Sequence, residues 1–226
     1  MSFINPFNSR SINMNKRKYT IVQILPALNT GGVERGVVEI SKALVNKNFR
    51  SIVISSGGYM VSQITRNGGI HYALDVHTKN PFKWPKIRNQ LKIILESENV
   101  DLIHFCSRAP AWIGVPLGPV LDIPIITSVH MRFRKANFLK KYYNSILTKG
   151  NSIIAISKHI EESIKYSFPQ VSSKIKIIHR GVDLDQFNTS KINPERIIAQ
   201  SKLLNLKDNV PVIIMAARPA MWKGYQ

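Results

Sequence analysis

The sequence predicts an α/β protein built on a Rossmann-like, doubly wound parallel sheet. Short apolar runs rich in β-branched residues alternate with segments whose apolar residues recur at helical spacing. The predicted strands are apolar throughout, which is typical of strands that are buried on both faces. Glycine pairs follow the first two strands, as expected for tight strand-to-helix loops. Ligands bind at the carboxyl ends of the strands in such sheets.

The first predicted unit is a strand at Thr20–Pro26, a turn at Asn29–Gly32 and a helix. The apolar residues Val33, Val37, Ile40 and Leu44 form one face of that helix. Glycines allow close approach to a ligand, and the helix start offers unpaired N–H groups to phosphate or sugar oxygens. The alternative is a tight turn that binds no ligand.

Seven further strands and six further helices follow in alternation. The strands are predicted at Ser51–Ser55, Ile70–Leu74, Asp101–Cys106, Ile123–His130, Ser152–Ser157, Lys174–His179 and Val210–Ala217. The helices are predicted as a short piece ending at Thr65, Trp84–Glu98, a broken helix at Ala111–Leu121, Phe138–Thr148, Lys158–Phe168 and Pro194–Leu204. In the predicted helix Phe138–Thr148, five residues are expected to face inward: Leu139, Tyr142, Tyr143, Ile146 and Leu147.

Three features of the sequence bear on targeting, membrane insertion and redox compartment. Residues 1–18 are polar and basic without the apolar core of a signal peptide, so we expect a disordered tail, and the start is left open between Met1 and Met14. The stretch Ala109–Ile126 contains four prolines and is a poor membrane helix. Cys106 is the only cysteine, which excludes an intrachain disulfide and fits a reducing compartment.

The net charge is +19 and the pI is near 10.2, which favours an anionic partner. Nucleic acid, a phosphorylated small molecule and an anionic membrane are the candidate classes. A genome biased toward Lys, Asn and Ile is the alternative origin of the charge. We expect no specific nucleic-acid partner, because the chain has no zinc motif, no RNA-binding signature and no basic recognition helix.

Polar, glycine and basic residues follow the predicted strands. They are Asn29–Glu34, Ser55–Gly58, His104–Arg108, His130–Arg132, Ser157–His159, Arg180, Gly181 and Asp183. The carboxyl ends of parallel strands share one edge, so these residues are expected to gather there. Their charge is mostly positive, which suits an anionic ligand.

Five segments together resemble the GT-B glycosyltransferases of family 4. In order they are NTGGVER (Asn29–Arg35), DLIHFCSRAP (Asp101–Pro110), ITSVHMRF (Ile126–Phe133), IIAISKHIEESI followed by KIKIIHRGVDLDQF (Ile153–Ile164 and Lys174–Phe187), and AARPAMWKGYQ (Ala216–Gln226). Each segment is weak alone, but their order and gaps match the family.

The resemblance implies an acceptor domain at residues 19–190, followed at 191–226 by a linker helix and the start of a donor domain. It implies transfer of a sugar, with retention, from a UDP- or GDP-sugar to a hydroxyl of a glycan or lipid-linked acceptor. No metal and no cofactor are expected. The expected process is the synthesis of lipopolysaccharide, glycolipid or another cell-envelope glycan, in the cytoplasm or at the inner face of the plasma membrane.

The resemblance also implies roles for individual residues. His130 is expected near the transferred sugar, and Gly31, Gly32, Arg218 and Lys223 near the donor phosphates. Fixed cations stabilise the charge that a departing diphosphate develops. Residues expected to contact acceptor or sugar are Glu34, His104, Arg108, Arg132 and Gly181.

Each of these roles has a structural alternative. Arg218 and Lys223 are also compatible with ordinary surface positions after a strand. Glu34 could simply favour the dipole at a helix start, and His104 could be hydrogen-bonded locally without a ligand. Asp183 and Asp185 are interpreted as turn residues and not as metal ligands, because no third ligand is nearby.

The paired glutamates that hold the donor in the family have no counterpart before Gln226. We therefore expect this chain alone to transfer no sugar. The open interpretations are an enzyme half that works with a separate C-terminal half, and an inactive remnant or binding module. A basic nucleic-acid-binding protein is the remaining alternative, given the charge of +19.

The segment Met131–Lys149 combines six basic residues with aromatic residues and has no acidic residue. Such a segment suits an anionic bilayer. The basic residues expected to contact it are Arg132, Arg134, Lys135, Lys140 and Lys141. The alternative is a solvated face whose aromatic side chains pack inward.

Overall fold

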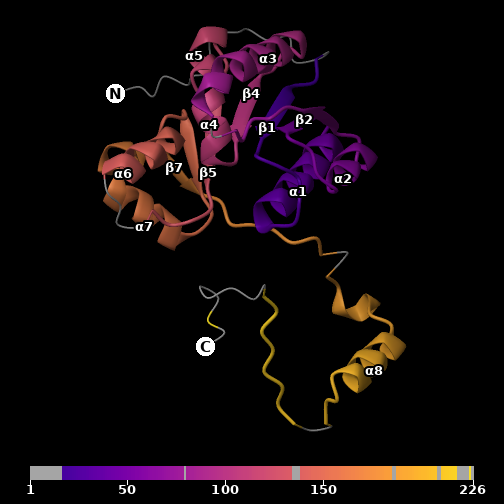
Figure 1. Cartoon of the computed structure of the whole chain (residues 1–226). Helices are drawn as coiled ribbons and strands as arrows, with labels where there is room; N and C mark the ends of the chain where they lie inside the picture. Colours follow the sequence, from indigo (N-terminus) through magenta and orange to yellow (C-terminus); the bar gives the residue numbers. More distant parts are fainter. Residues whose placement is uncertain are drawn as a thin grey trace. The chain divides into compact units, whose positions relative to one another are not determined.

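The computed structural model describes residues 17–78, 80–133, 138–184, 187–207, 210–217 and 224. The chain divides into two compact units, one ending at Gly181 and the other beginning at Val182 (Figure 1). The first unit contains the sheet.

The first unit is built on a seven-stranded sheet in the order β3-β2-β1-β4-β5-β6-β7. All neighbouring strands are parallel. The strands are β1 Thr20–Ile24, β2 Arg50–Ser55, β3 Ile70–Ala73, β4 Leu102–Phe105, β5 Ile125–Val129, β6 Ser152–Ala155 and β7 Ile175–Ile177. The predicted fold class is confirmed, and the strand order reverses between β1 and β4.

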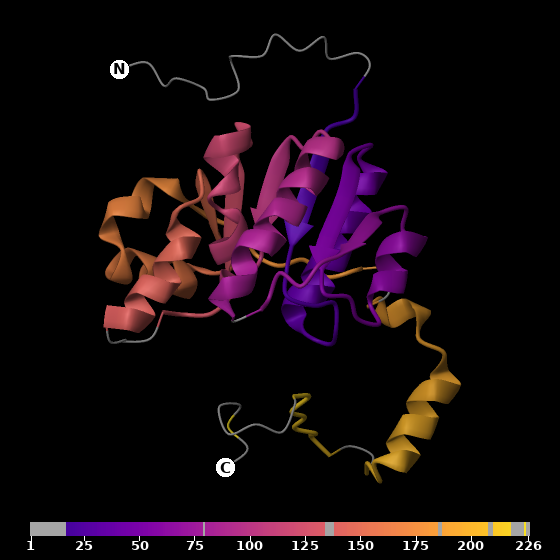
Figure 2. The ribbon, with the colours of Figure 1, turned by 45° about the horizontal axis from the view of Figure 1, so that its top comes forward.

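Helices connect successive strands and cover the sheet (Figure 2). The α-helices are α1 Gly32–Asn46, α2 Val61–Arg66, α3 Trp84–Ser97, α4 Arg108–Gly114, α5 Leu117–Leu121, α6 Phe138–Ser145 and α7 Lys158–Ser167. Short 3₁₀ turns are η1 Pro81–Lys83, η2 Ile146–Thr148 and η3 Pro169–Lys174. The predicted broken helix is the pair α4 and α5, interrupted before Pro116, whose nitrogen cannot donate a hydrogen bond.

Alternating strand residues pack into two hydrophobic layers. Ile24 and Phe105 belong to the larger layer, which includes Leu91 of α3 and Ile113 of α4. Side chains of the smaller layer lie on the other side, against α1 and α2: Leu25, Leu28, Val37, Val38, Val53, Met60, Ile64 and Cys106. Burial on both faces explains why the strands are continuously apolar.

The loops that follow β1 and β2 are bonded to each other. Leu28 N–H donates to the Gly57 carbonyl at 2.7 Å, and Met60 N–H donates to the Leu28 carbonyl at 2.9 Å. Gly58 has φ 134°, and a Cβ there would lie 2.5 Å from the Leu28 oxygen. Only glycine allows this approach, so the first loop is held rigidly beside the second.

The prediction that Leu139, Tyr142 and Tyr143 face inward is wrong. All three are exposed on α6, whereas Ile146 and Leu147 of η2 are buried as expected. The side that α6 turns toward the protein carries Asn144, whose Oδ1 accepts a hydrogen bond of 2.6 Å from Arg108. This polar anchor fixes the helix rotation and leaves the aromatic side chains outside.

The second unit contains η4 Thr189–Lys191 and α8 Pro194–Leu203. The Asn193 side chain accepts from Glu195 N–H and so begins α8. The predicted strand Val210–Ala217 is wrong: this stretch forms no ladder with any other described residue. A strand requires a neighbour whose backbone pairs with its own. None of the helices among the described residues is long and apolar enough to cross a membrane.

Candidate functional site

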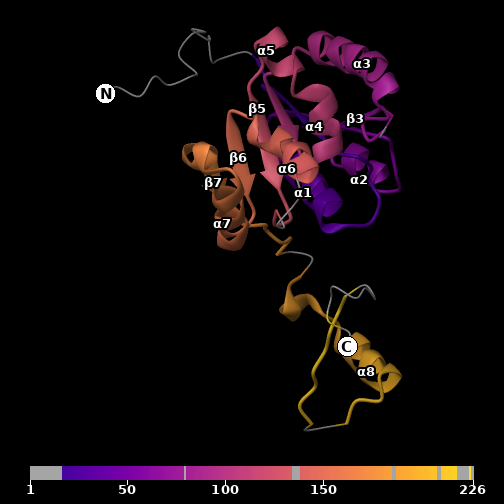
Figure 3. The ribbon, with the colours of Figure 1, turned by 60° about the vertical axis from the view of Figure 1, so that its left-hand side comes forward.

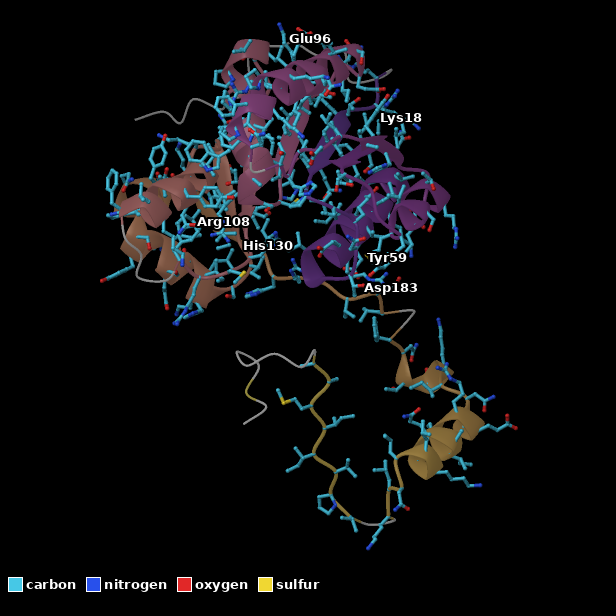
Figure 4. All side chains as sticks on the ribbon, viewed as in Figure 1. Lys18, Tyr59, Glu96, Arg108, His130 and Asp183 are labelled. Carbon is cyan, nitrogen blue, oxygen red and sulfur yellow. The ribbon has the colours of Figure 1, made fainter. Side chains whose placement is uncertain are left out.

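The candidate site lies at the carboxyl edge of the sheet, around the reversal of strand order between β1 and β4. Gly31 and Gly32 follow β1, Arg108 follows β4, His130 follows β5 and Arg180 follows β7. His130 and Arg108 both stand at this edge in Figure 4. The predicted gathering of strand-end residues is therefore observed for Gly32, His130 and Arg180, which are joined by hydrogen bonds.

Arg180 connects the two sides of the site. Its Nη2 lies 3.0 Å from Nδ1 of His130. Its Nη1 donates to the carbonyl oxygen of Gly32, at the start of α1. One guanidinium thus joins residues from β5 and the β1–α1 loop, and its charge remains at the edge because the side chain is exposed.

The contact with Arg180 fixes the tautomer of His130. A guanidinium is always a donor, so Nδ1 is the acceptor and Nε2 of the neutral ring carries the hydrogen. That Nε2 is buried and has no partner among the described residues. Burial, then the positive charge of Arg180 and the charge that His104 gains on protonation, lower the pKa of His130 to about 4. His130 is therefore neutral at pH 7 and presents an unused N–H donor.

The glycines of the β1–α1 loop make room for this arrangement. A Cβ on Gly32 would lie 3.0 Å from Nη1 of Arg180, whereas one on Gly36 would lie at an ordinary 3.6 Å. The Glu34 carboxylate lies beside Gly31, where a Cβ would collide with it. Glu34 thus occupies the first turn of α1, where a negative charge is favourable.

His104 is buried directly within the sheet. Its Nε2 shares a hydrogen bond of 2.6 Å with Ser128 Oγ, and Cys106 Sγ lies 3.8 Å from the same nitrogen. Burial lowers the pKa of His104 to about 4 and raises that of the Cys106 thiol to about 12, the latter against the opposing charge of Arg180. Both groups are neutral at pH 7, and His104 is close enough to His130 to affect its pKa.

The other predicted acceptor residues, Arg108, Arg132 and Gly181, differ in burial and in contacts. Arg108 is half-buried and bonded to Asn144, with its guanidinium carbon 5.8 Å from the centre of the Tyr143 ring. Arg132 and Gly181 are exposed. Arg108 thus holds α6 through Asn144. Gly181 follows Arg180 directly in the chain.

Four predicted contact residues lie outside the described residues: Arg218, Lys223, Arg134 and Lys135. Lys140 and Lys141 are exposed on α6. Within the described ranges, no three His, Cys, Asp or Glu side chains gather closely enough to hold a metal ion.

The sequence places Arg180 among the strand-end residues expected at the ligand edge, but it gives this residue no individual role. Its position just after the seventh strand was the available indication, since that strand end shares the edge with the others. Its contacts with His130 and Gly32 depend on the strand order, which the sequence pattern does not specify.

The chain resembles solved glycosyltransferases. A glycosyltransferase from Rickettsia africae is 34% identical over 92% of this chain and 55% of its own, with a TM-score of 0.80. HepE from Anabaena, solved with UDP-glucose, is 14% identical over 82% of this chain and 50% of its own, with a TM-score of 0.67. The lipopolysaccharide outer core galactosyltransferase WaaB is 14% identical over 73% of this chain and 46% of its own, with a TM-score of 0.58.

The chain thus spans about half the length of these solved proteins. No curated protein matches it in sequence. The model of Glycosyltransferase Family 4 matches residues 30–186, which include the glycine loop, His130 and Arg180. With this match and the close likeness to the Rickettsia africae enzyme, the chain belongs to glycosyltransferase family 4.

Proposed function

We propose that this chain forms the acceptor side of a retaining GT-B glycosyltransferase, which moves a sugar from a nucleotide-sugar donor to a hydroxyl acceptor. The observation that carries this proposal is the buried and unpaired Nε2–H of His130, which Arg180 holds beside the glycine loop. An unpaired buried donor costs about 1–3 kcal/mol, so a ligand oxygen that accepts from it recovers that energy.

His130 acts in this proposal as a donor and not as a general base. Its Nε2 already carries a hydrogen, and Nδ1 is occupied by Arg180. A neutral imidazole can donate to a hydroxyl oxygen of the transferred sugar and hold its orientation. The low pKa keeps the ring in this form across the neutral pH range.

Arg180 supplies the positive charge that a nucleoside diphosphate requires. The bond between the sugar and the diphosphate breaks during transfer, and negative charge develops on the leaving phosphate oxygens. Arg180 and the N–H groups at the start of α1 lie at one edge, so both are available to such oxygens. Arg218 and Lys223 are proposed to add charge at the same phosphates, without a bound metal.

The solved relatives support the choice of donor and process. HepE was solved with UDP-glucose and with UDP, which supports a UDP-sugar. WaaB acts on the lipopolysaccharide outer core, which supports an acceptor in a cell-envelope glycan. The proposed location is the cytoplasm, at the inner face of the plasma membrane.

Donor binding is the direct test, because the chain spans about half of the solved enzymes and turnover depends on the whole protein. Saturation-transfer NMR with UDP-glucose, and with GDP-mannose in parallel, detects weak binding. We expect transfer to sugar and ribose protons with the wild-type chain, reduced roughly two- to tenfold by His130→Ala, the value of one hydrogen bond.

His77→Ala is the matched control, since His77 is exposed and pairs with Asp75 outside the site. Signals that are absent with both donors, or that His130→Ala and His77→Ala reduce alike, contradict the proposal.

A further inference from the structure

Tyr59 is an aromatic residue that the protein holds on its surface. It follows β2 at the carboxyl edge of the sheet, where His130 also stands (Figure 4). Its side chain is 65% exposed, whereas the next residue, Met60, is buried in the layer against α1 and α2. The N–H group of Met60 donates to the Leu28 carbonyl, so the backbone beside Tyr59 is fixed to the β1–α1 loop. The exposure of the ring is therefore a fixed property of the two packed loops.

The hydroxyl of Tyr59 is bonded to the β1–α1 loop as well. It shares a hydrogen bond with Oγ1 of Thr30, the residue before the glycine pair. The two loops lead into α1 and α2, which lie side by side in Figure 3. Because the backbone and the hydroxyl are both held, the ring has few orientations open to it. Tyr59 thus offers a ligand a rigid apolar surface at little entropic cost.

Glu34 places a carboxylate beside the same loop. It lies against Gly31, which directly follows Thr30 in the chain. The Glu34 side chain is half-buried and has no hydrogen bond or ion pair with any other described residue. The neighbouring cation, Arg35, donates instead to Oε1 of Gln63 at 3.1 Å. In a chain with a net charge of +19, this carboxylate at the ligand edge is left to accept hydrogen bonds from a ligand.

An aromatic ring and a carboxylate together match the two chemical sides of a sugar ring. The C–H groups on one face of a pyranose pack against an aromatic surface. The hydroxyl groups at its edge donate to carboxylate oxygens, and such charge-assisted hydrogen bonds are the stronger kind. Other hydroxyl acceptors match less well. A phosphorylated or carboxylated group is repelled by Glu34, and an isolated hydroxyl of a peptide has no apolar face of comparable size.

We propose that Tyr59 and Glu34 bind the terminal sugar of the acceptor and select a neutral pyranose. The ring of Tyr59 packs against the C–H face of the sugar, and the Glu34 carboxylate accepts from its hydroxyl groups. Thr30 is a positioning residue, because it holds the Tyr59 hydroxyl. The proposal rests on the proposed sugar transfer, for which it names the acceptor class. It is independent of the donor contacts of His130 and Arg180.

Saturation-transfer NMR of the full chain, without a donor, tests the proposal. The probes are methyl glucopyranoside, methyl galactopyranoside and methyl mannopyranoside, each as both anomers. Methyl glucuronide is the anionic counterpart, and uridine tests whether a nucleotide base occupies the ring instead. We expect saturation transfer to the ring protons of at least one neutral glycoside, concentrated on one face of the sugar, and much weaker transfer to methyl glucuronide.

Single variants test the two side chains separately. Tyr59→Leu removes the aromatic ring and keeps an apolar side chain, and it is expected to weaken glycoside binding about three- to tenfold. Glu34→Gln removes the charge at constant size, and it is expected to weaken binding by about tenfold. Both residues are outside the buried core, so the fold is expected to persist, and circular dichroism checks this.

Tyr166→Leu and Glu39→Gln are the matched controls. Tyr166 is 78% exposed near the end of α7, and Glu39 is a half-buried carboxylate in the middle of α1. Neither side chain stands at the carboxyl edge of the sheet, so neither control is expected to change glycoside binding by more than about twofold.

A conservative pair tests the positioning role of Thr30. Thr30→Ser keeps the hydroxyl that bonds Tyr59 and is expected to bind glycosides as the wild type does. Thr30→Val removes that hydroxyl at similar volume and is expected to weaken binding about two- to tenfold. Equal binding by the two variants overturns the positioning role.

The remaining outcomes separate this proposal from sugar transfer itself. Absence of signals from every neutral glycoside overturns the proposal even where UDP-glucose binds. Equal losses in the control variants and in Tyr59→Leu or Glu34→Gln overturn it, as do uridine signals that depend on Tyr59 while glycoside signals do not. Glycoside binding that requires both side chains, without any binding of UDP-glucose or GDP-mannose, contradicts sugar transfer and leaves a sugar-binding site.

Discussion

Arg180 Nη2 lies 3.0 Å from His130 Nδ1, although 50 residues separate them in the chain. The contact orients the imidazole and leaves its remaining N–H as an unpaired donor, while burial and then the charge of Arg180 lower its pKa and keep the ring neutral. It also places a guanidinium beside the start of α1.

Arg180→Gln is expected to raise the pKa of His130 above about 4, though not to its ordinary value of 6.5, because burial, the larger cause, remains and only the positive charge of Arg180 is lost. Histidine titration by NMR measures the change. His71 is an internal control, since burial alone lowers its pKa. Equal shifts of His71 and His130, or none at His130, contradict the assigned contact.

Gly32→Ala is expected to displace Arg180, because the new Cβ would lie 3.0 Å from Nη1. The pKa of His130 then rises, by less than in Arg180→Gln because the arginine charge is kept, and UDP-glucose binding weakens. Gly36→Ala is the matched control: its Cβ meets Arg180 at 3.6 Å, an ordinary contact. It leaves the titration unchanged and raises the free energy of unfolding by roughly 0.5–1 kcal/mol, since alanine is favoured within a helix.

Gly58→Ala is expected to lower the free energy of unfolding by more than about 1 kcal/mol, through an unfavourable φ of 134° and a collision with the Leu28 carbonyl. Gly57 also has a positive φ, but a Cβ there meets nothing within 4 Å. Gly57→Ala therefore measures the cost of a side chain at positive φ alone, without a steric collision. Urea unfolding of both variants measures the collision, and losses of equal size would show that the two loops do not pack as described.

Stability is expected to fall as the pH decreases from about 6.5 toward 4. The unfolded chain protonates His104 near pH 6.5, whereas the folded protein does so only near pH 4, so protons favour unfolding between these values. The full loss attributable to His104, reached below pH 4, is on the order of 3 kcal/mol, and about half of it falls between pH 6.5 and 5, because one pKa unit corresponds to about 1.4 kcal/mol. Urea unfolding at pH 6.5 and 5 measures that half, and His104→Gln is expected to show a smaller loss over this interval.

Cys106 is expected to resist thiol reagents in the folded protein. Burial raises its pKa to about 12, and its side chain is enclosed in the layer under α1 and α2. Titration with a disulfide reagent at pH 8 is expected to give less than about one tenth of the rate seen in urea. A native rate equal to the unfolded one would mean that this layer opens readily.

The sequence alone determined the fold class and the order of strands and helices in the first unit. Continuous β-branched runs such as Ser51–Ser55 are compatible with strands buried on both faces, and helical spacing such as Ile87, Leu91 and Leu95 produces a buried face. These are local properties of periodicity and burial. They also place His130 and Gly32 at strand ends, and therefore at one edge of the sheet.

The tertiary structure decided what the local pattern leaves open. Arg180 joins the site only because β7 lies in the same parallel sheet as β5, so their carboxyl ends meet at one edge. The Asn144–Arg108 bond sets the rotation of α6 and reverses the expected direction of Tyr142 and Tyr143. Val210–Ala217 has the apolar composition of a strand but not its structure. Strand pairing and helix rotation depend on partners distant in sequence, so periodicity cannot specify them.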